Sequence, residues 1–137
     1  MDVGEYTLTD DLTVFGVRIK NFPAGIGGAF DGLIKMLPGG FDRSFYGISE
    51  WNGNGMIYRA AALETYKGEA DQYPCERYTI EKGAFLYTVI TDWRPKTSRI
   101  NGVFGELMKD VRFDRTKPSV EWYKNEQEMW CMVRKIL

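Results

Sequence analysis

Two copies of one sequence pattern decide the fold of this chain. Residues 28–35 read GAFDGLIK, and residues 102–109 read GVFGELMK. Shortly after each copy, residues 41–44 read FDRS and residues 113–116 read FDRT. Matching segments that recur in the same order indicate an internal duplication. The predicted pseudo-repeats run from about residue 6 to 64 and from about residue 75 to 137.

Helices and strands follow each other in the same order in both halves. Apolar residues at spacings of three and four predict helices at about residues 25–36 and 97–111. The apolar sides of these helices, which should be core, are Phe30, Leu33, Phe104, Leu107 and Met108. Alternating patterns predict strands at residues 6–20, 45–49, 56–64, 75–80, 83–91, 117–125 and 129–136. Pro23 should stop the first strand, and the strands at 75–80 and 83–91 should pair around a tight turn at residues 81–83.

A half of this size cannot bury the apolar face of its own helix, so the two halves should share one sheet. We therefore expect a single α+β domain over residues 1–137, built from a duplicated β-α-β-β unit. Its antiparallel sheet would carry both helices on one face. The other face would stay open and form a central ligand groove along the seam between the halves.

Composition excludes several classes of function. The chain has 18 Lys and Arg against 19 Asp and Glu, and no basic block marks a nucleic-acid surface. The first residues have no signal-peptide pattern, and no apolar run approaches the ~20 residues of a membrane span. We therefore expect a cytoplasmic protein with reduced Cys75 and Cys131, which binds neither nucleic acid nor membrane. The absence of His excludes His-based nucleophile systems and metal sites, and no cofactor is expected.

The closing hairpin carries the sharpest candidate residue. Residues 117–125 read KPSVEWYKN, and strand alternation places Glu121 and Tyr123 on one face. A carboxylate among aromatic residues is costly unless it is solvated, paired or used. The plain alternative is an exposed Glu121, or one paired with Arg59 or Lys135. Burial beside aromatic rings would instead raise the pKa of Glu121 and suit it to acid–base chemistry.

Aromatic residues in or beside predicted strands are the other candidates for the groove wall, and each has a structural alternative. Tyr123 would be a wall residue or a hydrogen-bond partner of Glu121, while ordinary cross-strand or helix packing would explain the rest equally well. The remaining candidates are Tyr46, Tyr58, Tyr87, Trp51, Trp93 and Trp130.

Three motifs in this order resemble a known family. Residues 45–49 read FYGIS, residues 78–85 read YTIEKGAF, and residues 118–123 read PSVEWY. Together with the duplication, they resemble the gyrase-inhibitor-like (GyrI-like) small-molecule-binding domain. That domain is also the effector-binding module of bacterial AraC-type and MerR-type multidrug transcription regulators. The resemblance covers nearly the whole chain.

The resemblance implies a groove for amphipathic, often cationic or planar molecules, in which Glu121 supplies the counter-charge. The chain shows no helix-turn-helix pattern, so a stand-alone binding or sequestering protein is expected rather than a fused regulator. Some similar single-domain proteins hydrolyse strained cyclopropane-containing compounds. The alternative is therefore a hydrolase in which Glu121 activates water and Tyr123 or Tyr46 polarises the leaving group. A third hypothesis is a protein-interaction module that inhibits a topoisomerase.

Overall fold

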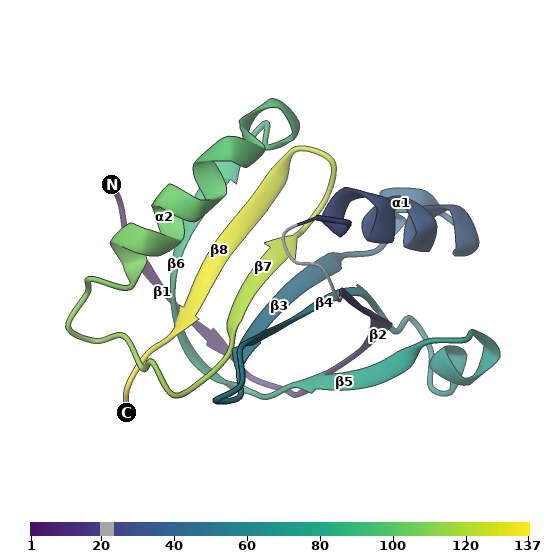
Figure 1. Cartoon of the computed structure of the whole chain (residues 1–137), viewed down its shortest axis with the longest axis horizontal. Coiled ribbons are helices and arrows are strands. Elements are labelled where there is room, and N and C mark those ends of the chain that lie inside the picture. The colour runs from purple at the N-terminus through teal and green to yellow at the C-terminus, as the bar shows by residue number, and fades with distance from the viewer. Residues whose placement is uncertain (20–23) are drawn as a thin grey trace.

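The computed structural model describes residues 1–19 and 24–137, and these residues form eight strands and two α-helices (Figure 1). The prediction for Pro23 lies outside the described residues. Three short 3-10 segments occupy Gly40–Asp42, Glu69–Gln72 and Arg94–Arg99. The main elements in chain order are β1 (Gly4–Leu8), β2 (Leu12–Ile19), α1 (Ile26–Met36), β3 (Phe45–Trp51), β4 (Met56–Leu63), β5 (Glu76–Ile80), β6 (Gly83–Thr91), α2 (Ile100–Leu107), β7 (Ser119–Tyr123) and β8 (Glu128–Arg134).

All eight strands belong to one antiparallel sheet, which curls into a half-barrel. The strand order is β1-β6-β8-β7-β3-β4-β2-β5. In the second half of the chain the order β6-β8-β7 mirrors the order β2-β4-β3 of the first half, and the halves meet where β7 pairs with β3. The first strand of each half lies at the edge of the other half: β1 pairs with β6, and β5 pairs with β2.

Two predictions about strands are wrong. The single strand expected at residues 6–20 is two strands, β1 and β2, separated by the polar residues Thr9, Asp10 and Asp11. The strands β5 and β6 do not pair with each other: β5 pairs with β2, and β6 lies between β1 and β8. Asp11 accepts a hydrogen bond of 2.8 Å from the backbone N–H of Lys82, which holds the β1–β2 and β5–β6 turns together.

The second helix is shorter than its apolar pattern predicts. The α-helical part ends at Leu107, and the chain before Ile100 is a 3-10 segment. The side chain of Asp110 accepts hydrogen bonds from the backbone N–H and the guanidinium of Arg112. A side chain that bonds to the backbone two residues later offers an alternative to helical bonding, so the chain turns here. Val111, the last residue of the predicted helix, is 91% exposed, and Met108, which was expected to be core, is 40% exposed.

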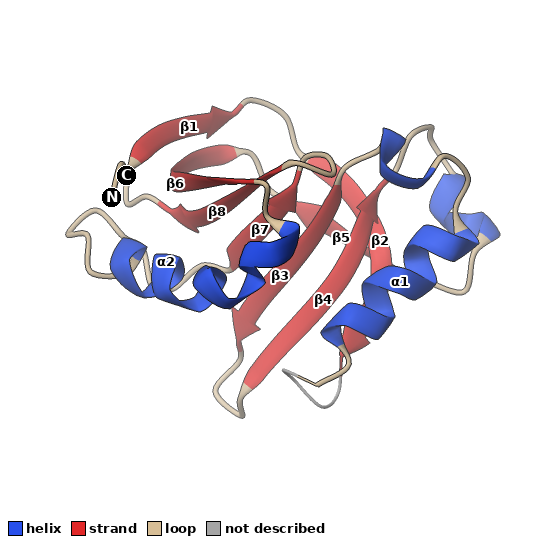
Figure 2. Ribbon diagram, turned by 90° about the horizontal axis from the view of Figure 1, so that it is seen from above, coloured by secondary structure: helices blue, strands red, loops and turns tan. Residues whose placement is uncertain are grey.

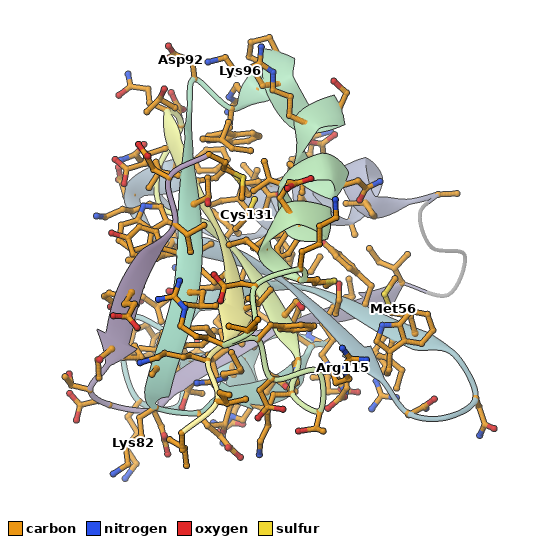
Figure 3. The ribbon with its side chains drawn as sticks, turned by 90° about the vertical axis from the view of Figure 1, so that its left-hand side faces the viewer. Met56, Lys82, Asp92, Lys96, Arg115 and Cys131 are labelled. Carbon is orange, nitrogen blue, oxygen red and sulfur yellow. The ribbon has the colours of Figure 1, made fainter. Side chains whose placement is uncertain are left out.

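Both helices lie on one face of the sheet, as predicted. The helix α1 packs on β4 and β2, while α2 packs on β8 and β6. The central strands β3 and β7 pass between the two helices (Figures 1 and 2). Leu33 of α1, Leu37 just after that helix, and Leu107 of α2 join one buried core with side chains of the sheet. Cys131 of β8 belongs to this core and lies on the side of the sheet that faces α2 (Figure 3).

The opposite face is not the open surface that was expected. A second buried core covers it, made by Val14, Tyr46, Ile48, Ala61, Ile80, Phe85, Val120 and Met132. Because the sheet curls, strands from both of its ends contribute to this core. Alternate residues of β3, β4, β7 and β8 therefore point into two different cores, as the period of two in a strand requires.

A buried ion pair fixes the polar loop between the two halves. Arg43 makes two hydrogen bonds of 2.8 Å to the carboxylate of Glu69 and a third of 3.1 Å to the backbone oxygen of Leu63. Glu69 is 1% exposed and also accepts bonds from the backbone and hydroxyl of Thr65. The bonds from Arg43 are the main cause that lowers the pKa of Glu69.

Replacing Glu69 by Gln should destabilise the protein by about 3–5 kcal/mol, because it leaves the buried charge of Arg43 without a partner. Urea unfolding measures this loss. A control is Glu106→Gln, which removes an exposed pair with Lys109 and should cost less than about 1 kcal/mol. The double variant Arg43→Met with Glu69→Leu should recover most of the stability. Equal losses for Glu69→Gln and Glu106→Gln would contradict the assigned role.

Candidate functional site

Glu121 lies in the middle of β7, at the seam between the two halves of the sheet. Its neighbours across the sheet are Gly47 of β3 and Cys131 of β8. Its side chain is on the face that carries the helices, where it is partly buried. The oxygen Oε1 of Glu121 accepts hydrogen bonds from the hydroxyl of Tyr58 at 2.9 Å and from the hydroxyl of Tyr123 at 2.7 Å. A carboxylate and two phenols from both halves thus form one cluster.

Gly47 makes room for this cluster, and the sequence patterns did not single it out. A Cβ atom at residue 47 would lie 2.1 Å from the hydroxyl oxygen of Tyr58 and 2.7 Å from Oε1 of Glu121. Real contacts are never so close, so only glycine allows Tyr58 to reach Glu121 across β3. A glycine in the interior of a strand is itself a signal of a close approach by another group.

Burial raises the pKa of Glu121 above its usual range, and the hydrogen bonds from Tyr123 and Tyr58 oppose this shift without cancelling it. Burial and the charge of Glu121 raise the pKa values of Tyr58 and Tyr123, so both phenols stay protonated and donate. Burial also raises the pKa of the Cys131 thiol to about 12, which leaves it a neutral packing group. The cluster therefore combines one carboxyl group whose pKa is raised with two phenols that stay protonated.

A cleft of about 280 Å³ adjoins the cluster on the helix side of the sheet. Tyr123 connects the two, because its hydroxyl bonds to Glu121 while its ring lines the cleft. The ring of Tyr123 has edge contacts with Phe30 of α1 at 5.3 Å and with Trp93 at 4.9 Å. Aromatic side chains from α1, from the sheet and from the segment before α2 therefore form the wall.

The cleft has few polar groups. Its charged residues are Asp31 and Arg94, and the guanidinium of Arg94 lies over the rings of Phe41 and Trp93 at 5.1 and 5.3 Å. The indole N–H of Trp93 donates to the backbone oxygen of Asn125 at 2.8 Å, which fixes this ring. Phe41 and Phe45 also line the cleft. The sequence analysis did not select Phe41 or Phe45, since isolated Phe residues are usually core. It assigned Phe30 to core packing alone.

The predicted site residues do not line a single groove. Glu121, Tyr123 and Tyr58 form the cluster, and Trp93 contacts Tyr123. Trp51, at the end of β3, is 73% exposed beside the β3–β4 turn. Side chains alternate along a strand, and three of the predicted residues occupy positions that point to the opposite face of the sheet from Glu121: Tyr46, Tyr87 and Trp130.

Neither plain alternative describes Glu121. Arg59 pairs with Glu50 and Glu76, while Lys135 pairs with Glu5. In the part of the chain that the structure describes, no Lys or Arg forms an ion pair with Glu121. The same residues contain no group of three or more His, Cys, Asp or Glu side chains that could hold a metal ion. They also contain no helix long and apolar enough to cross a membrane.

Comparisons with known proteins define the fold class. No family model matches the chain, and no curated protein matches it. Among solved structures, an integron cassette protein from the mobile metagenome of Vibrio cholerae is similar, with 15% identity, a TM-score of 0.72, and coverage of 97% of this chain and 95% of that chain.

Two further structures share the fold over their length. The protein SAV2435 bound to tetraphenylphosphonium has 17% identity and a TM-score of 0.68 over 98% of this chain and 94% of that chain. A structure described as a bacterial transcription regulation protein from Staphylococcus aureus has 14% identity and a TM-score of 0.63 over 98% of this chain and 99% of that chain. At these identities the likeness establishes a shared α+β fold, and one protein with that fold binds a lipophilic cation.

Replacing Gly47 by Ala should break the bond between Tyr58 and Glu121 and destabilise the protein by about 1–3 kcal/mol, as overpacking does. The matched control is Gly105→Ala in α2, where a Cβ meets nothing within 4 Å. Alanine there should stabilise the helix by about 0.5–1 kcal/mol. Thermal and urea unfolding of both variants check this difference. A Gly47→Ala variant as stable as the wild type would show that Tyr58 does not need this space.

The raised pKa of Glu121 should make stability depend on pH. The folded protein holds the proton of Glu121 more tightly than the unfolded chain does. The stabilisation that this proton gives is therefore fully present below the ordinary pKa of 4.5. It is then lost as pH rises through the higher pKa of the folded state. The free energy of unfolding of the wild type should therefore fall relative to that of Glu121→Gln as pH rises above 4.5. If the difference in free energy of unfolding between the wild type and Glu121→Gln stayed constant with pH, the raised pKa would be contradicted.

Proposed function

We propose that this protein binds a lipophilic cation or a similar amphipathic small molecule on the helix side of the sheet, with Glu121 as counter-charge. The observation that carries the proposal is a partly buried carboxylate whose described partners are two neutral phenols. A carboxylate in this setting lacks a compensating positive charge. A bound cation would supply that charge and lower the pKa of Glu121 again.

The aromatic wall supports the cationic character of the ligand. Tyr123, Phe30 and Trp93 line the cleft next to the Glu121 cluster, and the ring of Tyr123 has edge contacts with the other two rings. Aromatic faces attract cations, and the attraction is greatest when the cation is desolvated. A volume of about 280 Å³ lies at the lower end of the range of about 300–1,000 Å³ for ligand pockets. This size favours a small ligand, or a larger one that is only partly enclosed.

The comparisons support the ligand class without identifying the ligand. One of the similar structures is bound to tetraphenylphosphonium, a lipophilic cation whose own phenyl groups surround its charge. The similar transcription regulation protein is consistent with a relationship to regulator effector modules. We further propose that the chain belongs to the gyrase-inhibitor-like family and arose by duplication of one unit. In this proposal it acts alone in the bacterial cytoplasm and sequesters its ligand. The mirrored strand order of the two halves is what a duplication produces.

Tetraphenylphosphonium is the probe that tests the proposal. Calorimetric titration should show binding to the wild type and an affinity at least about tenfold lower for Glu121→Gln, equivalent to about 1.4 kcal/mol. Binding to the wild type should also tighten as pH rises through the raised pKa of Glu121, because only the ionised carboxylate attracts the cation.

Two controls separate the counter-charge from other effects. Glu126→Gln makes the same change in net charge at an exposed position and should leave affinity unchanged. Tetraphenylborate has the same shape as tetraphenylphosphonium but a negative charge, and should bind the Glu121→Gln variant no more weakly than the wild type. Equal affinity of wild type and Glu121→Gln for the cation would overturn the role of Glu121.

A hydrolase is the second candidate, and the cluster itself favours it. Glu121 has a raised pKa, retains some exposure, and has two phenol donors beside it. Such a carboxylate could remove a proton from water as the water oxygen attacks an electrophilic carbon of a bound substrate. The bond from that carbon to the leaving atom then breaks, and the carboxyl group returns the proton to the leaving atom. Mass spectrometry of candidate esters and strained-ring compounds would detect product. Turnover by the wild type that Glu121→Gln abolishes would favour the enzyme, and binding without product would favour the sequestering role.

A protein-interaction role remains the third proposal, with a topoisomerase as the partner. A stoichiometric complex that forms equally well with the wild type and Glu121→Gln would favour it over both roles that use the carboxylate. Loss of that complex in the presence of tetraphenylphosphonium would instead place the partner on the helix side of the sheet.

A further inference from the structure

A second cavity lies on the face of the sheet opposite Glu121. Its volume is about 220 Å³, and each of the eight strands contributes at least one lining residue. The cavity is thus the interior of the half-barrel that the curled sheet forms. Its lining includes the aliphatic and phenyl side chains of Leu8, Leu12, Leu63, Ile80, Phe85 and Met132.

The lining determines the charge of a molecule that could enter. Among the described residues, the cavity is lined by no Asp, Glu, Lys or Arg side chain. An ion placed here would lose its hydration without gaining a counter-charge, at a cost of several kcal/mol or more. An uncharged molecule would instead gain by burying apolar surface, at about 25 cal/mol per Å².

The volume indicates the size of that molecule. An apolar protein cavity of about 150 Å³ stays dry and binds benzene. The cavity of about 220 Å³ exceeds that size by enough for a substituted or fused aromatic ring. Tyr46 and Trp122 stack on each other with ring centroids 6.4 Å apart. Both line the cavity, so a flat aromatic molecule would find a flat wall.

One end of the cavity carries hydrogen-bonding groups. The hydroxyl of Ser44 accepts a bond of 3.0 Å from the indole N–H of Trp122. Tyr46 is 4% exposed, and burial raises the pKa of its hydroxyl, an effect that the nearby Ser44 hydroxyl opposes. A phenol has one donor and two acceptor positions, so the Tyr46 hydroxyl retains bonding capacity for a ligand.

We propose that this cavity is a second ligand site, which takes a small uncharged aromatic molecule with one hydrogen-bonding group. The ring lies inside the half-barrel against Tyr46 and Trp122, and the polar group bonds to Tyr46 or Ser44. The site is separate from the Glu121 cluster because successive residues of β7 point to opposite faces. Trp122 lines this cavity, while Glu121 and Tyr123 belong to the other face.

Two methionines of β8 report on the two faces without any substitution. Met132 lines the second cavity, and Met129 belongs to the core on the helix side. In protein labelled with ¹³C at the methionine methyl groups, indole should shift the Met132 signal in a saturable manner and leave Met129 nearly unchanged. Excess tetraphenylphosphonium should not displace the indole. This makes the outcome independent of the function proposed for Glu121.

Two substitutions test the contacts. Leu63→Trp should fill the cavity and abolish the effect of indole on Met132, with Leu12→Phe as a second variant if Leu63→Trp does not fold. Tyr46→Phe should weaken indole binding about five- to tenfold, the worth of one hydrogen bond, and leave toluene binding unchanged.

The proposal is overturned if indole does not bind, if it shifts Met129 in place of Met132, or if tetraphenylphosphonium displaces it. It is also overturned if folded variants with a filled cavity bind indole as tightly as the wild type. Failure of tetraphenylphosphonium to bind would affect only the site at Glu121.

Discussion

The pairing of β3 with β7 is the interaction on which the rest of the structure depends. It joins the two halves of the chain into one sheet and places Gly47 opposite Glu121. The missing side chain of Gly47 leaves the space through which Tyr58 of β4 reaches across β3 to the carboxylate. A candidate site that draws on both halves of the chain is thus a direct consequence of the seam and of one glycine in it.

The positions of the helices determine how the seam can be used. Each helix covers the outer strands of its own half, and the central strands lie between them. The central strands therefore present Glu121 and Tyr123 beside an aromatic cleft. On the opposite face the same strands present Tyr46 and Trp122 to the interior of the half-barrel. One pair of strands supplies two chemically different surfaces, one with a carboxylate and one without charge, because side chains alternate along each strand.

Two glutamates show how their surroundings set opposite electrostatic roles. Glu69 receives two hydrogen bonds from Arg43, and its pKa is lowered, so its charge is part of the folded structure. Glu121 receives bonds only from neutral phenols among the described residues, and burial raises its pKa. A charge that the fold already compensates stabilises the protein. A charge that the fold leaves uncompensated is available to a ligand or to a proton.

The sequence by itself determined the local features of this protein. The apolar spacing predicted both helices, alternating patterns predicted most strands, and alternation around Glu121 predicted its shared face with Tyr123. Only the tertiary structure decided that β5 and β6 pair with distant strands, that Tyr46, Tyr87 and Trp130 turn away from Glu121, and that a second core fills the other face. Periodicity records which residues share a face of one element. The pairing of strands far apart in the chain depends on how the whole sheet curls and closes its apolar surfaces, and no local pattern contains that information.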